Sequence, residues 1–152
     1  MRCDAAGPGT FRGGTGVDYE AEVTGASQHS FRGEGLATPS GYGTQGGGDG
    51  AKGEMMMYPD DSEAFEPPQY GNMEIGSFRI TASSPAGGGW GDPLGRDPDL
   101  LLRDVRDGLV SRAAARDIYG VIVDDDGRSL DLAATQHCRD SLCQTEYTPA
   151  LS

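Results

Sequence analysis

The residues best suited to line a binding or catalytic site form a short run, AGGGWGDP (86–93), between a predicted strand and a predicted helix. Glycine permits close backbone approach and positive φ, so three in succession could present backbone N–H groups to a ligand or a neighbouring chain. Trp90 offers a large apolar anchor or a stacking surface. The competing interpretation is a tight crossover packed against the rest of the protein. The sequence thus predicts a substrate-proximal loop of Gly87, Gly88, Gly89, Trp90 and Asp92.

Other candidate nucleotide-binding and catalytic motifs lack a supporting context. Gly41, Gly43 and Gly46 have GxGxxG spacing. A dinucleotide site needs a strand before such a run and a helix after it, and neither is indicated, so a flexible glycine loop is favoured. No Walker motif and no GxSxG nucleophile elbow is present. No His, Cys or carboxylate lies in a motif that would support a general base, so the catalytic residues are unknown at this stage.

Metal-ligand residues are present without metal-ligand spacing. His137, Cys138 and Cys143 do not form the paired pattern of a four-ligand zinc site, and Cys138 lies on an apolar helix stripe. The carboxylates of residues 58–66 lack the spaced acidic residues and the glycine of a calcium loop, which favours a solvated acidic loop. His29 is expected in a loop or at the surface. We predict that this segment itself binds no metal.

Composition and charge disfavour several classes of function. Asp and Glu number 24, Lys and Arg number 12, and the net charge is −12. Nucleic-acid binding needs clustered Lys and Arg, so no nucleic acid is expected. No apolar run approaches the length of a membrane span, and the N-terminus lacks the apolar region of a signal peptide. Three cysteines give no disulfide framework, which favours a reducing cytoplasm.

Apolar content is low for a domain that folds alone. Leu, Val, Ile and Phe make up 24 of 152 residues, and such a low share with a large net charge is typical of disorder. The local patterns are nevertheless orderly. We therefore expect an incomplete α+β domain whose core is completed by another part of the same polypeptide or by another subunit.

The chain that must position the loop changes in composition near Gly95, since only three of the 25 glycines lie beyond this residue. Residues 1–95 are predicted to be a strand-and-loop part. Alternating apolar residues indicate a half-buried strand at 17–23, with Val17, Tyr19, Ala21 and Val23 inward. Further strands are predicted at 54–58 and 77–82, and long loops at 38–53 and 58–72.

Residues 96–152 are predicted to be helices around one short strand. Asp97 can cap a helix with Pro98 at its first position, and Gly108 ends it. Its apolar stripe is Leu101, Val105 and Leu109. Ser111 caps a second helix at 112–119, and an apolar strand with an Asp/Gly turn follows at 119–127. A last helix begins near Ser129 or Asp131, with a buried stripe of Leu130, Ala134, Cys138 and Leu142.

Two stretches resemble the hydantoinase B/oxoprolinase family. The run 85–135 is similar to that family's C-terminal signature: a glycine run, an aromatic, Gly-Asp-Pro, Arg-Asp-Pro opening a helix, then Gly-x-Val-Ser and Tyr-Gly-Val. The matching residues are Gly87 to Gly89, Trp90, Gly91, Asp92, Pro93, Arg96, Asp97, Pro98, Asp104, Val105, Gly108, Val110, Ser111, Tyr119, Gly120 and Val121. Trp90 stands where tyrosine is commoner. Near the N-terminus, a glycine-rich stretch also matches, at Gly7, Gly9, Phe11, Arg12, Gly13, Gly14 and Gly16.

The resemblance implies an ATP-dependent enzyme that opens cyclic amides such as 5-oxoproline or N-methylhydantoin. It implies two partners, a hydantoinase A-type subunit or domain and the remainder of the hydantoinase B chain. ATP and a divalent metal would belong to the whole assembly, with the ATP site on the partner and the metal ligands upstream of this segment. The chain thus resembles a C-terminal segment, whether a fragment, a split-gene product or the result of a wrongly assigned start.

Two alternatives stay open. Related members of the family carboxylate ketones, so the chain could be a segment of an acetone- or acetophenone-type ATP-dependent carboxylase. It could also be a non-catalytic structural fragment that holds a larger complex together. In either case the isolated chain is expected to be marginally folded and inactive.

Overall fold

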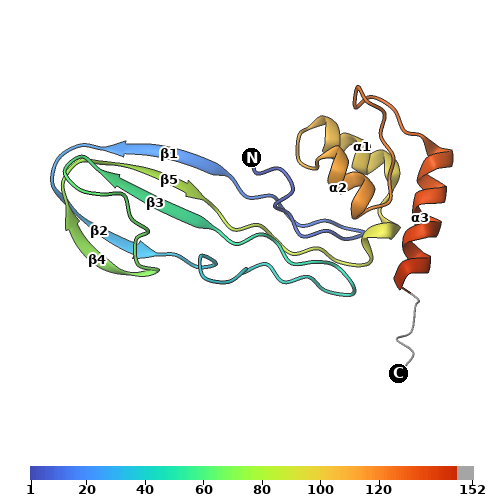
Figure 1. The fold of residues 1–152 in the computed structure, drawn as a ribbon. Coiled ribbons are helices and arrows are strands. Elements are labelled where there is room, and N and C mark those ends of the chain that lie inside the picture. Colours follow the sequence, from blue (N-terminus) through green and yellow to red (C-terminus); the bar gives the residue numbers. More distant parts are fainter. Residues whose placement is uncertain (147–152) are drawn as a thin grey trace.

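The computed structural model describes residues 1–146 and has the α+β class that the sequence predicts. The strands form one end of an elongated molecule and the helices the other, and extended glycine-rich segments run between them (Figure 1). In chain order the elements are β1 (Asp18–Val23), β2 (Ser27–Arg32), β3 (Glu54–Pro59), β4 (Tyr70–Ile75), β5 (Phe78–Ser83), the 3-10 turn η1 (Pro93–Gly95), α1 (Pro98–Arg106), α2 (Arg112–Asp117) and α3 (Leu132–Glu146).

The strands make two small antiparallel sheets, one in the order β1-β5-β3 and one that pairs β2 with β4. The three strands at 18–23, 54–59 and 78–83 confirm the predicted ones. The buried residues of the larger sheet include Met57, Phe78 and Ala82. The ring of His29 meets that of Phe78 edge-on, with 4.7 Å between centroids, and so connects the two sheets.

Two expectations about the strands are wrong. β1 is not half-buried: Tyr19 is 49% exposed, Ala21 is also exposed, and Val17 just before the strand is 47% exposed. β1 is an edge strand, and no other described segment covers its apolar face. His29 lies in β2 rather than in a loop. Neither β2 nor β4 was predicted, because β2 has no apolar alternation and in β4 the alternation is confined to the four residues Asn72–Ile75.

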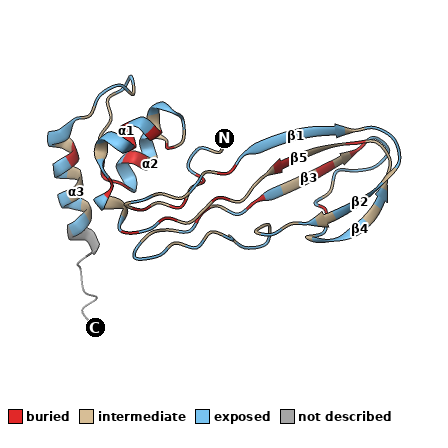
Figure 2. Cartoon of the chain, turned by 180° about the vertical axis from the view of Figure 1, so that it is seen from behind, coloured by how far each residue is buried: buried red, intermediate tan, exposed pale blue. Residues whose placement is uncertain are grey.

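The glycine-rich segments form what we call the glycine bundle, residues 5–14, 41–51 and 86–91. Residues 86–91 run through it. Gly87 bonds through its backbone to Gly7 and Gly14, and Gly89 bonds to Thr44 and Gly48, at 2.9 Å in every case. A residue of a β-strand bonds to neighbouring strands on two sides only, whereas this segment bonds to residues at both ends of the run 5–14 and of the run 41–51. Figure 2 shows that buried residues recur along these segments.

Only glycine fits such close packing of backbone against backbone. A Cβ added at Gly89 would overlap the carbonyl oxygen of Pro8, and one added at Gly47 would overlap that of Gly89. The segment 38–53 is a loop, as predicted, with no helix or strand. It is not a free loop, because its backbone is hydrogen-bonded into the bundle.

The helical region begins as the sequence predicts. Asp97 caps α1, its Oδ1 accepting hydrogen bonds from the N–H groups of Asp99 (2.8 Å) and Leu100 (3.2 Å). Ser111 caps α2 by accepting from the N–H of Ala114 at 3.0 Å. Gly108, at φ +70°, follows the end of α1. The N–H of Ala134 donates to Asp131 at 2.8 Å at the start of α3.

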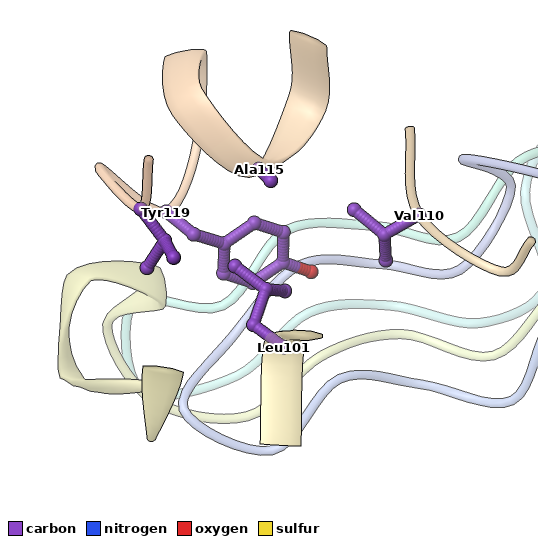
Figure 3. Packing of buried hydrophobic residues seen from close by; sticks show 5 residues of the cluster. Leu101, Val110, Ala115 and Tyr119 are labelled. Carbon is purple, nitrogen blue, oxygen red and sulfur yellow. The ribbon is translucent and has the colours of Figure 1, made fainter. Parts of the chain in front are cut away.

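A small apolar core holds the helical region. Its buried members are Leu101, Val110, Ala115, Tyr119 and Val121, and Figure 3 shows the ring of Tyr119 among the side chains of Leu101, Val110 and Ala115. On α3 the predicted stripe is only half-buried, and the buried residue is Thr135, whose hydroxyl accepts from the N–H of Ile122 at 2.9 Å.

The strand predicted at 119–127 is wrong. It is reduced to an isolated bridge between Val123 and Leu130. Gly120 has a φ of +62°, which breaks the extended run, and the N–H of Ile122 bonds to a side chain of α3 instead of a strand. The division into parts 1–95 and 96–152 stays a prediction; in the structure the last strand ends at Ser83 and α1 begins at Pro98. The last residues of the second part, 147–152, lie outside the described structure.

Candidate functional site

The predicted loop, Gly87 to Asp92, lies at the centre of the glycine bundle. The N–H of Gly87 donates to Gly14 and that of Gly89 to Gly48, both at 2.9 Å. These two donors are therefore engaged in holding the bundle together. The part of the loop that reaches the surface is its end, where Trp90 and Asp92 are exposed. A site-lining role for the loop stays a prediction, and it falls on these two side chains.

Trp90 forms an aromatic pair with Phe11. The two residues exchange backbone hydrogen bonds, Phe11 N–H to Trp90 O at 3.0 Å and Trp90 N–H to Phe11 O at 2.8 Å. Their ring centroids are 5.7 Å apart with planes tilted by 49°. Trp90 is 51% exposed and Phe11 63% exposed. The pair thus presents aromatic surface to its surroundings from a backbone that is bonded on several sides.

Asp92 has a structural contact of its own. Its Oδ1 accepts a hydrogen bond from the N–H of Leu94 at 2.8 Å and caps η1, while its carbonyl accepts one from the Thr10 hydroxyl at 2.7 Å. The second contact ties the end of the loop to the residue that precedes Phe11. The carboxylate of Asp92 keeps one oxygen, Oδ2, outside the cap.

A buried ion cluster lies where the glycine bundle meets α1, and we call it the Asp104 clasp, residues Arg12, Arg96 and Asp104. Arg12 Nη2 donates to Asp104 Oδ1 at 2.8 Å. Arg96 donates to Asp104 Oδ2 through Nη2 at 2.6 Å and Nε at 3.2 Å. Both oxygens of one carboxylate are thus bonded to two cations, and all three side chains are 16% exposed or less.

Opposing effects act on the carboxyl group of the clasp. Burial raises the pKa of Asp104, but the hydrogen bonds and charges of Arg12 and Arg96 outweigh it, so the pKa lies below its ordinary value. The Asp104 hydrogen bond raises the pKa of Arg12. Burial raises the pKa of Tyr119, whose hydroxyl lies within the electrostatic influence of the same three groups. The clasp therefore stays ionised near neutral pH.

Arg12, Arg96 and Asp104 match the family pattern in the sequence, but that pattern predicts no role for them. Arg12 and Asp104 are 92 residues apart, and no local spacing connects them. Their positions in the sequence could have indicated a role. Arg96 follows η1, close after the predicted loop, and Arg12 follows Phe11, which pairs with Trp90 of that loop.

The remaining candidates do not gather into a site. Within residues 1–146, no group of three or more His, Cys, Asp or Glu side chains is placed to hold a metal ion. Cys138 is half-buried on α3, with its thiol 3.8 Å from the carbonyl of Arg116. None of the described helices is long and apolar enough to cross a membrane.

An open groove of about 910 Å³ lies on the β1-β5-β3 sheet. Residues of all three strands line it, among them Asp18, Glu54, Met56, Tyr58 and Thr81. No residue of the predicted loop and none of the clasp takes part in it. The groove is therefore separate from the site that the sequence predicts.

Comparison with protein families gives a match to the model described as hydantoinase B/oxoprolinase, over residues 1–93. The beta subunit of caprolactamase from Pseudomonas jessenii is 36% identical over 149 residues, which is 89% of this chain and 24% of that protein. The B subunit of a putative D-/L-hydantoinase from a Pseudomonas species is 28% identical over 91% of this chain and 24% of its own length. The delta subunit of acetophenone carboxylase from Aromatoleum aromaticum is 39% identical over 70 residues, 46% of this chain and 10% of that protein.

Two solved structures have a similar fold. The nucleotide-free structure of acetone carboxylase matches with a TM-score of 0.75 at 21% identity, covering 100% of this chain and 25% of that one. The ATP-dependent caprolactamase from Pseudomonas jessenii matches with a TM-score of 0.63 at 34% identity, over 91% of this chain and 24% of that one. The chain thus spans about a quarter of the length of the first relatives and structures it matches.

Proposed function

The chain belongs to the hydantoinase B/oxoprolinase family, and from this premise we propose that it is the C-terminal segment of a hydantoinase B-type subunit in an ATP-dependent cyclic-amide hydrolase. The reaction proposed is ring opening of 5-oxoproline, of a hydantoin or of a related lactam. The hydrolase would act together with a hydantoinase A-type partner.

One observation carries this proposal. The 36% identity to the caprolactamase beta subunit extends over 89% of the chain, so it includes the greater part of both the strand region and the helical region. The structure of an ATP-dependent caprolactamase repeats the fold over 91% of the chain. A segment that is similar both in sequence and in fold to a lactam-opening enzyme is best explained as part of such an enzyme.

The role proposed for this segment is scaffold and one wall of the reaction site. The glycine bundle places Trp90 and Phe11 at the surface without a flexible linker, and the aromatic faces suit a small planar amide ring. The family resemblance implies a divalent metal with ligands upstream of this segment, so we assign the metal to the rest of the assembly. ATP is assigned to the partner.

The test is activity of the complete hydantoinase B-type chain, produced with its hydantoinase A-type partner. We expect ATP-dependent release of the ring-opened acid from 5-oxoproline, a hydantoin or caprolactam. Trp90→Ala is expected to lower kcat/KM for the ring substrate, because an exposed aromatic contact is removed. Tyr42→Ala is the matched control, since Tyr42 is 68% exposed within the same bundle but is not part of the aromatic pair. Equal activity of both variants would contradict the site-lining role.

A carboxylase is the second candidate, favoured by the 39% identity to the acetophenone carboxylase delta subunit. The same preparation decides between the two. Consumption of a ketone that requires ATP and bicarbonate, with no ring opening of any lactam, would support the carboxylase and overturn the hydrolase.

A further inference from the structure

Two runs of chain carry the aromatic pair, and both are connected to the same carboxylate. Arg12 directly follows Phe11 and donates to Asp104 Oδ1 at 2.8 Å. Arg96 lies at the end of the run that begins with Trp90, and it donates to Asp104 Oδ2 at 2.6 Å. Asp104 therefore holds, from α1, the two segments whose relative placement defines the pair.

Further hydrogen bonds make this connection specific. Arg96 Nη1 also donates to the carbonyl of Thr10 at 3.1 Å, so one guanidinium bonds both to the carboxylate and to the residue before Phe11. From α3, Arg139 donates to the carbonyl of Arg96 at 2.6 Å and to that of Tyr119 at 3.1 Å. The run around Trp90 is thus tied to α1, to α3 and to the segment after α2.

Stability alone is a weak explanation for such a cluster. A buried ion pair is often matched or exceeded in stability by apolar residues of the same volume, because both charges must leave water. The clasp moreover leaves Arg12 Nε buried without an acceptor among residues 1–146, and an unsatisfied donor has a cost of its own. What the charges add is direction, since each guanidinium can meet the carboxylate in few geometries.

We propose that Asp104 is a positioning residue, which acts through Arg12 and Arg96 to fix the Phe11–Trp90 pair in one orientation toward the reaction site. The proposal rests on the proposed function only for the last step, that the aromatic pair lines this site. The mechanical step, that Asp104 holds the pair in place, concerns the described residues alone.

The mechanical step is tested by hydrogen–deuterium exchange on the full chain in its assembly. Asp104→Asn keeps the shape of the side chain and removes its charge. We expect faster exchange of the reciprocally bonded amides of Phe11 and Trp90. The internal reference is the bridge between Met57 and Phe65, which exchange backbone bonds of 2.9 and 3.0 Å far from the clasp. Its exchange should not change.

A control variant and a second test variant separate positioning from a general loss of stability. Asp99→Asn removes an exposed carboxylate from the same helix and should change neither bridge. If Asp104→Asn fails to fold, Arg96→Lys retains the charge and loses the two-nitrogen contact to Oδ2, and the same selective rise in exchange is expected. Unchanged exchange of Phe11 and Trp90 in a folded variant, or an equal rise at Met57 and Phe65, would overturn the positioning role.

Steady-state kinetics of the assembled enzyme tests the remaining step. A misplaced wall of the site is expected to lower kcat of Asp104→Asn by up to about 100-fold, more than it changes KM. Faster exchange at the pair with unchanged kcat and KM would leave the mechanical step standing and contradict the site-lining function. Slow exchange with lowered kcat would contradict the mechanical step, so the two failures are distinguishable.

Discussion

The glycine bundle and the helical region are packed by opposite means. In the bundle, backbone lies mostly against backbone, and the residues are held by hydrogen bonds from several directions with few side chains between them. In the helical region, side chains such as Leu101 and Val121 fill the space between the elements, and both are completely buried. The interior of the bundle therefore has no room for added side-chain atoms, whereas the helical core is destabilised when side-chain atoms are removed.

The largest effect is expected from adding one methyl group to the bundle. In Gly89→Ala the new Cβ would overlap the carbonyl oxygen of Pro8, and neither backbone can move without breaking hydrogen bonds. We expect the free energy of unfolding to fall by more than about 4 kcal/mol. Because the isolated chain is expected to be only marginally folded, the loss is measured in the full chain of the assembly, as faster hydrogen–deuterium exchange of bundle amides such as that of Gly89.

Gly14→Ala is the matched control for that substitution. Gly14 is the last residue of the bundle's first run, but a Cβ there would meet nothing within 4 Å, so a change within about 0.5 kcal/mol is expected. Similar losses in Gly14→Ala and Gly89→Ala would show that the bundle is not limited by space.

Removal of side-chain atoms from the helical core should have the next largest effect. Leu101→Ala leaves a cavity at a residue with no exposed surface, and it is expected to cost about 3 kcal/mol. Far-ultraviolet circular dichroism during urea unfolding detects the loss of helix. Leu100→Ala, at the neighbouring residue that is 42% exposed, should cost less than about 1 kcal/mol. Equal costs at the two positions would contradict the assignment of the core.

A smaller effect is expected at the first cap of the helical region. Asp97→Ala removes the acceptor of the N–H groups of Asp99 and Leu100 and should lower the free energy of unfolding by about 1 kcal/mol. Asp97→Asn retains a capping oxygen and is expected to change stability little. The same denaturation experiment checks both variants, and a loss as large in Asn as in Ala would rule out the cap as the cause.

The smallest effect is expected from a change of pH near neutrality. It concerns the contribution of the Asp104 clasp, which joins the two regions, to the free energy of unfolding. The folded pKa of Asp104 lies below its unfolded value, which is about 3.9. The carboxylate therefore contributes stability that is fully present above the unfolded pKa and is lost as pH falls through the folded pKa. We expect no change from this group between about pH 7 and pH 5 and a loss in stronger acid.

The control for the pH effect is Asp104→Asn, in which this part of the acid dependence should be absent. Unfolding free energies of both proteins across the acid range provide the measurement. An identical acid dependence in the two would show that Asp104 does not titrate in the folded protein as its contacts indicate.

Much of the local structure could be predicted from the sequence. The caps at Asp97 and Ser111 and the strand at Phe78–Ser83 depend on residues within a few positions of one another. The family could also be identified from the order of glycines and Asp-Pro pairs around Trp90. The predicted loop at Gly87–Asp92 lies where the two runs of the aromatic pair meet, although its role in the reaction stays a prediction.

Other features could not be read from local patterns. β2 lacks apolar alternation and β4 shows it over four residues only, whereas the apolar residues of β1 alternate but are mostly exposed. The extended run from Tyr119 was expected to be a strand but has no partner strand among the described residues. In each case the deciding factor is which distant segment lies alongside, and periodicity contains no information on that.

By itself the sequence determined the α+β class, the helix starts and the abundance of glycine before Gly95. Only the tertiary structure decided that those glycines pack backbone to backbone and that Asp104 joins two arginines from opposite parts of the chain. The physical reason is the separation along the chain of the residues that interact. Caps and strand patterns act over a few residues, whereas Gly89 and Pro8, or Asp104 and Arg12, meet only after the whole chain has folded between them.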